Sequence, residues 1–213
     1  MRGPLVLIGP PGAGKSSCAE HLSRETGRSR IDVDERQWPL LRSHPDIAAV
    51  EPAGLLVAGD VAPGARRAYL TAVRERLTAG RGEATARRIL EEAKARATIG
   101  LLETASVEAV LDLGAGHSIY EHLDLRARVQ LALRGARVVL LLPCADVEAA
   151  VAVLAARLAA QGRAQAGPRL RSYVTHPSNH ALAGEVLHTG DDTIAGLCAR
   201  LSASRALNSP GWA

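Results

Sequence analysis

Aromatic residues are scarce in this chain of 213 residues: they make up 2% of it, and phenylalanine does not occur. A surface that stacks single-stranded bases needs aromatic side chains, so the composition argues against that function. The hydrophobic residues, 47% of the chain, are therefore mainly aliphatic. This mixture is typical of alanine-rich helices packed on buried valine and leucine strands in one globular domain.

Cysteine is also sparse. The three cysteines, Cys18, Cys144 and Cys198, lie far apart, and no two of them form a C-x-x-C pair. Neither a zinc site nor a disulfide framework is indicated, so we expect free thiols and a cytoplasmic protein. No apolar run has the length of a transmembrane helix, and a strand pattern begins at Leu5. We therefore expect no signal peptide and no membrane partner.

Lysine occurs only at Lys15 and Lys94, and the other basic residues are arginines. The net charge is +4, and the basic residues are dispersed along the chain. Dispersed charge predicts a solvated surface and no nucleic-acid partner. One of the two lysines lies in the most informative motif of the chain.

That motif is a complete G-x-x-x-x-G-K-[ST] phosphate-binding loop, Gly-Pro-Pro-Gly-Ala-Gly-Lys-Ser at residues 9–16. An apolar strand pattern at 5–8 precedes it, and an amphipathic helix pattern at 17–26 follows, closed by Gly27. Backbone N–H groups and the positive end of a helix then face one phosphate. We expect Lys15 to reach the β- and γ-phosphates and Ser16 to ligate Mg²⁺. The predicted nucleotide-binding residues are Gly9, Pro10, Pro11, Gly12, Ala13, Gly14, Lys15, Ser16 and Ser17.

Strand and helix patterns alternate along the chain, which predicts an open, mainly parallel sheet covered on both faces. Strands are expected at 5–8, 30–33, 107–111, 137–142 and 185–188, with a weaker candidate at 55–58. Helices are expected near 17–26, 65–78, 83–103, 123–133, 146–161 and 193–203. Asp146 is expected to cap its helix, and Asp191 or Asp192 the last one. We expect a single domain with a core at 1–34 and 105–207, a helical insertion at 35–104 and a lid at 161–172.

Two acidic segments follow predicted strands. Asp32 and Asp34 point to one side of a strand end, where one could hold Mg²⁺ and the other accept a proton from a hydroxyl. The alternative is an aspartate-rich turn that caps a helix. Asp112 ends an apolar run in the manner of a Walker B acid, and it competes with Asp34 for the role of base. Gly114, Ala115, Gly116 and His117 come next; they either admit a substrate to the backbone or form a tight turn.

Arginines gather around the predicted lid, at Arg157, Arg163, Arg169 and Arg171. A phosphoryl transfer needs positive charge over the transferring group, and we expect Arg163 to supply it, with Arg157 and Arg169 at the nucleotide. Any one of them could equally be solvated surface. Arg87 and Arg88 are candidates for acceptor binding; the alternative is surface pairing with Glu91 and Glu92.

Taken in order, these segments resemble the shikimate kinase-like small-molecule kinases of the P-loop superfamily. The resemblance is carried by Gly9 to Ser16, by Asp32-Val33-Asp34, by Gly114-Ala115-Gly116 and by the arginine-flanked lid. It implies a three-layer α/β/α P-loop fold, like that of nucleoside monophosphate and shikimate kinases, with a five-stranded, mainly parallel sheet. It also implies an enlarged helical acceptor subdomain and a lid.

The same resemblance implies an ATP-dependent phosphotransferase with ATP and Mg²⁺ as cofactors and a small-molecule hydroxyl as acceptor. Asp34 would bind the acceptor hydroxyl, Asp32 would lie near Mg²⁺, and Arg87 matches loosely an arginine that grips the acceptor carboxylate. The segment between Asp34 and Gly114 is longer than shikimate requires, so we expect another polyol, sugar or secondary metabolite. The alternatives are a genuine shikimate or gluconate kinase and a regulatory ATP-binding module. Either a monomer or a homodimer is compatible with the sequence.

Overall fold

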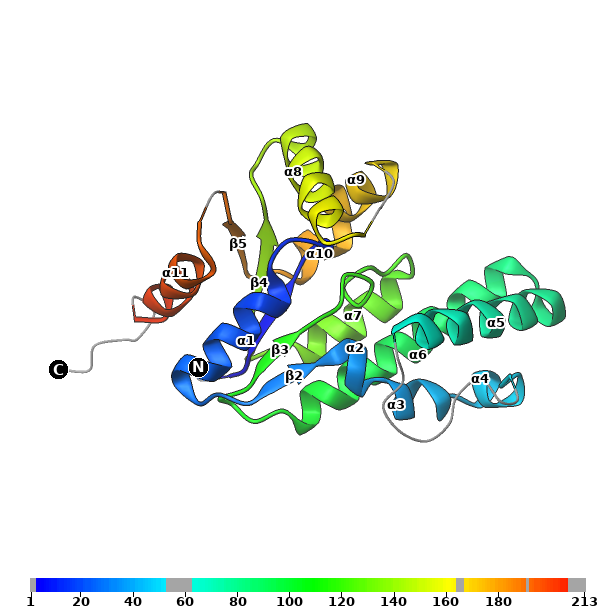
Figure 1. Ribbon diagram of the computed structural model, residues 1–213. Helices are drawn as coiled ribbons and strands as arrows, with labels where there is room; N and C mark the ends of the chain where they lie inside the picture. Colours follow the sequence, from blue (N-terminus) through cyan, green and yellow to red (C-terminus); the bar gives the residue numbers. More distant parts are fainter. Residues whose placement is uncertain (1–2, 53–62, 164–166, 191, 207–213) are drawn as a thin grey trace.

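The computed structural model describes residues 3–52, 63–163, 167–190 and 192–206. Its centre is a sheet of five parallel strands in the order β2-β3-β1-β4-β5, shown in Figure 1. The strands are β1 (Leu5–Ile8), β2 (Arg30–Asp32), β3 (Val110–Asp112), β4 (Arg137–Leu142) and β5 (Glu185–His188). The predicted parallel sheet is therefore confirmed. The weaker strand candidate at 55–58 lies outside the described residues.

The order of the strands places the phosphate-loop strand in the middle of the sheet. β1 pairs with β3 on one side and β4 on the other, and all four of its residues are buried. Strand β3 differs from the prediction of 107–111, because Val107 is 53% exposed and lies within a turn in which the Ala109 N–H donates to the Ser106 carbonyl. The strand consequently includes Asp112, which brings that carboxylate to the carboxyl end of the sheet.

Helices cover both faces of the sheet, which confirms the three-layer architecture (Figure 1). On one face α1 (Lys15–Thr26) packs against α11 (Ile194–Ala206), and on the other α7 (Leu123–Ala132) packs against α6 (Glu83–Thr104) and α10 (Pro177–Leu182). The Asp146 side chain caps α8 (Val147–Ala160), accepting from Ala149 N–H at 2.7 Å, as predicted.

The prediction for the cap of α11 was wrong for Asp192. Thr193 Oγ1 accepts from Gly196 N–H at 3.1 Å instead, and Asp192 forms an ion pair with Arg200. A hydroxyl directly before the helix reaches its first-turn N–H groups, whereas Asp192 lies one residue further away. Asp191 is outside the described residues.

The segment between β2 and β3 is helical and has a hydrophobic cluster of its own. It contains α2 (Val33–Arg36), α3 (Trp38–Arg42), α4 (Pro45–Ala49), α5 (Pro63–Arg81) and α6. Pro39 and Pro45 lie in the first turns of α3 and α4, where a missing N–H is tolerated. The buried cluster is built around Trp38 and Tyr69, whose rings meet edge to face at 5.7 Å between centroids. We call this second cluster the insertion core; its other members are Leu41, Ile47, Val73, Leu77, Ala86, Ile89, Ala93 and Ala97.

Two short helices follow α8, where the sequence predicted a lid at 161–172. Residues 164–166 of that segment lie outside the described residues, and α9 (Gly167–Thr175) begins directly after them. α9 packs against α8, and α10 starts at Pro177. Among the helices that the structure describes, none is both long and apolar enough to cross a membrane.

Candidate active site

A cleft of about 730 Å³ lies beside the phosphate-binding loop, at the carboxyl ends of the central strands. Open α/β sheets bind their ligands at this edge, and the volume is within the usual range for a ligand pocket. The cleft is lined by residues 11–17, Asp32, Asp34, Asp112, residues 114–116, Arg157, Ala160, Gln161, Arg163, Thr189, Asp192, Ile194 and Leu197.

The loop at residues 9–16 has the backbone shape that an anion site needs. Gly9 has φ +137°, and a Cβ there would lie 2.4 Å from the Leu141 carbonyl oxygen, so only glycine allows the loop to pass β4. Gly14, at φ +90°, opens α1, and within the described residues no side chain caps that helix. The first N–H groups of α1 therefore face the cleft, where the positive helix end favours an anion.

Lys15 is buried at the floor of the cleft, and its Nζ donates to the carbonyls of Gly9 at 2.9 Å and Pro10 at 3.0 Å. Burial lowers the pKa of Lys15, and the negative charges of Asp112 and Asp34 partly offset that effect. The loop thus fixes its ammonium beside two carboxylates.

Asp112 and Asp32 form the acidic edge of the cleft. Asp112 is 4% exposed, and its Oδ1 is buried without a hydrogen-bond partner in the described part of the chain. Burial raises the pKa of Asp112, despite the nearby Lys15 ammonium and a hydrogen bond with Ser16. Asp32 accepts from Glu35 N–H at 3.2 Å, so it also caps α2 as the alternative interpretation of this segment predicted.

These carboxylates, with the Ser16 hydroxyl, suit Mg²⁺, which prefers oxygen ligands and retains several waters. An unpartnered buried carboxylate oxygen beside a hydroxyl is a position that a hard cation would satisfy. No cluster of three or more acidic, histidine or cysteine side chains that could hold a metal occurs among the described residues. A cation here would therefore depend on water and substrate phosphates for its other ligands.

Asp34 also lines the cleft, from α2. His117 Nε2 is 3.2 Å from Asp34 Oδ1, and a Cβ on Gly114 would lie 2.2 Å from both Asp34 carboxylate oxygens. Desolvation acts to raise the pKa of Asp34, but the His117 hydrogen bond and the charges of Lys15 and Arg66 outweigh it and lower that pKa. The side chain remains 61% exposed to the cleft, so an ionised carboxylate faces the space.

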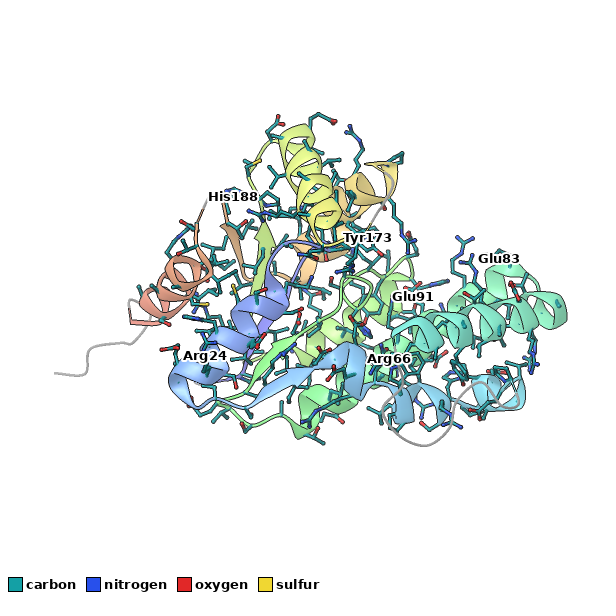
Figure 2. All side chains as sticks on the ribbon, viewed as in Figure 1. Arg24, Arg66, Glu83, Glu91, Tyr173 and His188 are labelled. Atoms are coloured by element: carbon teal, nitrogen blue, oxygen red, sulfur yellow. The ribbon has the colours of Figure 1, made fainter. Side chains whose placement is uncertain are left out.

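Sequence reasoning missed Arg66. Its Nη1 donates to the Asp34 carbonyl at 3.3 Å, and its Nε is buried without a partner among the described residues. Figure 2 shows Arg66 beside α2, although more than thirty residues separate it from Asp34. No local signal distinguishes Arg66 in a chain rich in arginine, because its position depends on how α5 packs beside α2.

The arginines predicted around the lid divide into two groups. Arg157 and Arg163 line the cleft, and Arg157 donates to Thr189 Oγ1 at 3.2 Å and to the Gly190 carbonyl at 2.8 Å. The charge of Arg163 lowers the pKa of Lys15. Arg169 is exposed on α9 and does not line the cleft, and Arg171 forms an ion pair with Glu148.

The structure does not bring Arg87 and Arg88 to the cleft. Arg87 is 3.7 Å from Glu83, and Arg88 forms a two-pronged ion pair with Asp124 at 2.7 and 3.3 Å. Surface pairing, the alternative interpretation, therefore describes both arginines, although the partners are not Glu91 and Glu92. Glu91 instead accepts from the backbone N–H of His122 and contacts its ring, each at 2.9 Å.

Comparison with known proteins identifies the fold. No family model matches the chain, and no curated protein matches it by sequence. Among solved structures, it is similar to a shikimate kinase from Acinetobacter baumannii in complex with shikimate, with a TM-score of 0.60 and 17% identity over 98% of this chain and 95% of that one. A shikimate kinase from Bacteroides thetaiotaomicron gives a TM-score of 0.54 and 16% identity over 96% and 98% of the two chains. The chain therefore has a shikimate kinase-like fold.

Proposed function

We propose that this protein transfers the γ-phosphoryl group of ATP, with Mg²⁺, to a hydroxyl of a small molecule. The observation that carries the proposal is the placement of Lys15 and Asp34 on one cleft: a phosphate-loop ammonium and a carboxylate with a lowered pKa. Phosphoryl transfer depends on positioning and on charge stabilisation, and these two groups serve the donor and acceptor sides.

On the donor side, the backbone of residues 9–16 would hold the phosphates, and Lys15 would neutralise charge that develops on the γ-phosphoryl group. Ser16, Asp32 and Asp112 would hold Mg²⁺, which draws charge away from the phosphate oxygens when bound. Arg163 would add positive charge over the transferring group, and Arg157 would lie at the nucleotide. Arg169, exposed on α9, remains a proposed contact of the lid with the nucleotide.

On the acceptor side, Asp34 is the better base of the two candidates. Asp112 is buried beside Ser16, where it would hold Mg²⁺, whereas Asp34 is exposed to the cleft, where an acceptor hydroxyl can reach it, and its lowered pKa keeps it deprotonated. The acceptor hydroxyl oxygen forms a bond to the γ-phosphorus while the bond to the ADP oxygen breaks. The hydroxyl proton passes to Asp34.

The acceptor would lie against the turn at 114–116 and beside the insertion at 35–104. Arg66 does not itself line the cleft, but its Nη1 donates to the carbonyl of Asp34, which does, so it brings a positive charge to this side of the cleft. A guanidinium pairs best with a planar anion, so an acceptor that carries a carboxylate as well as hydroxyls fits the site. The His117 side chain is only 5% exposed and both ring nitrogens face protein groups, so it is not a direct acceptor contact in this proposal.

The experiment measures ADP release and phosphorylated product with ATP, Mg²⁺ and a panel of shikimate, gluconate, other hydroxy acids, polyols and sugars. We expect acceptor-dependent ADP release with at least one hydroxy compound, and its loss in Asp34→Asn. ATP binding by the wild-type protein and by Asp34→Asn, measured by titration calorimetry, serves as the control. ATP binding without any acceptor-dependent release would contradict the proposal and favour a regulatory nucleotide-binding module.

A further inference from the structure

The ring of His117 is a buried partner of Asp34 that the proposed reaction does not yet use. The side chain is 5% exposed, and it belongs to the loop between β3 and α7 that also contains Gly114. The backbone N–H of His117 donates to the Gly114 carbonyl at 2.8 Å, which closes this loop into a turn. One turn therefore supplies two surfaces to Asp34: the bare Cα of Gly114 and the imidazole edge of His117.

Two side-chain donors, from His117 and Gln37, contact the Asp34 carboxylate at the same oxygen, Oδ1. His117 Nε2 is 3.2 Å from Oδ1, and the Gln37 amide nitrogen is 3.5 Å from Oδ1. The shorter contact comes from the buried ring, and the longer one is at the limit of a hydrogen bond. In the described part of the chain, this arrangement leaves Oδ2 without a side-chain donor, so it can accept from a hydroxyl in the cleft.

The other ring nitrogen of His117 also has a polar neighbour. His117 Nδ1 is 3.3 Å from the hydroxyl of Thr98, a fully buried residue of α6. Since an ionised carboxylate only accepts, Nε2 must carry a proton, and the Thr98 hydroxyl can then donate to Nδ1 of the neutral ring. A partner at one nitrogen determines which nitrogen is protonated, as in other carboxylate–histidine pairs.

We propose that His117 is a positioning residue for the proposed base: its Nε2–H holds Asp34 Oδ1, and Thr98 keeps the ring in the tautomer that can do so. The proposal rests on the proposed function. It connects α6, which contributes to the insertion core, with the carboxylate that takes the acceptor proton. Loss of the ring would leave Asp34 Oδ1 with only the longer Gln37 contact among the described residues, so the carboxylate could rotate away from this position.

The test compares His117→Gln, whose amide can keep an N–H near Asp34, with His117→Leu, which keeps volume but has no donor. Thr98→Val removes only the hydroxyl that fixes the tautomer. Nitrogen-15 NMR of the His117 ring reports, without any acceptor, which ring nitrogen carries the proton. We expect the proton on Nε2 in the wild-type protein, as the Asp34 contact requires, and a larger share of the Nδ1–H tautomer in Thr98→Val.

Turnover with the acceptor panel provides the second measurement. We expect His117→Leu to lose about 10- to 100-fold in kcat with an unchanged KM for ATP, and His117→Gln to recover most of it. Equal losses in both variants, with Nδ1 and not Nε2 protonated in the wild-type ring, would mean that the ring only fills space and would overturn the proposal. Asp34→Asn is measured in parallel: if it keeps full turnover, the proposed base is wrong, whereas full turnover in His117→Leu alone refutes only the positioning role.

Discussion

Asp32 and Asp112 are register partners at the carboxyl ends of the neighbouring strands β2 and β3. Arg30 lies between their carboxylates, 3.1 Å from Asp32 Oδ2 and 3.9 Å from Asp112 Oδ2. Only Asp112 is fully buried, and its neighbour's negative charge adds to burial in raising its pKa. The pair therefore forms an acidic edge whose charge is only partly compensated by protein groups.

Asp112→Asn should weaken Mg²⁺-dependent ATP binding by at least about tenfold, because the buried carboxylate is the best-placed cation ligand. A carboxyl whose pKa is raised in the folded state costs stability as pH rises above its usual value of 3.8. Asparagine removes that cost, so the melting temperature without nucleotide at pH 7 should not fall. Calorimetric titration and thermal unfolding measure the two effects.

The control for this change is Asp46→Asn, because Asp46 pairs with Arg81 in the insertion, outside the cleft. It should leave Mg²⁺-dependent ATP binding unchanged. A lower melting temperature in Asp112→Asn with unchanged ATP binding would show that Asp112 is structural.

Arg66→Ala should raise the KM for a carboxylate-bearing acceptor by about 10- to 100-fold, since a charged hydrogen bond contributes roughly 1.5–3 kcal/mol. The KM for ATP should change little. Initial-rate kinetics separates the two constants. Arg87→Ala is the matched control, because Arg87 pairs with exposed Glu83 away from the cleft; equal effects of the two changes would argue against an acceptor role for Arg66.

Gly114→Ala should abolish most acceptor turnover and preserve ATP binding. The new Cβ would lie 2.2 Å from both Asp34 carboxylate oxygens, so that side chain must move away from the turn. Gly80→Ala is the control, because Gly80 lies in α5 outside the cleft lining and a Cβ there meets no atom within 4 Å among the described residues. Similar turnover in the two variants would show that the position of the Asp34 carboxylate does not matter.

The sequence predicted the features of the site that depend on one segment at a time. The loop at 9–16 is a local motif, and Asp32, Asp34 and Asp112 follow strand patterns whose carboxyl ends must meet at one edge of a parallel sheet. Arg66 and the Gly114–Asp34 contact could not be predicted, because they depend on how segments far apart in sequence pack together.

The bounds of the strands were also only partly predictable from the sequence. The predicted start of β3 was three residues early, because the apolar Val107 is exposed in a turn and does not point into the core. Hydropathy alone does not separate an apolar turn residue from a strand residue.

The central claim is transfer of a phosphoryl group to an acceptor hydroxyl, and isotope transfer tests it most directly. ATP with ¹⁸O in its γ-phosphoryl group is incubated with Mg²⁺, the protein and the acceptor panel. The products are then identified by mass spectrometry. The account predicts a phosphorylated acceptor that carries the labelled oxygens, formed roughly 10²- to 10³-fold more slowly by Lys15→Ala. Label found only in inorganic phosphate, or Lys15→Ala forming the labelled product at the wild-type rate, would contradict it.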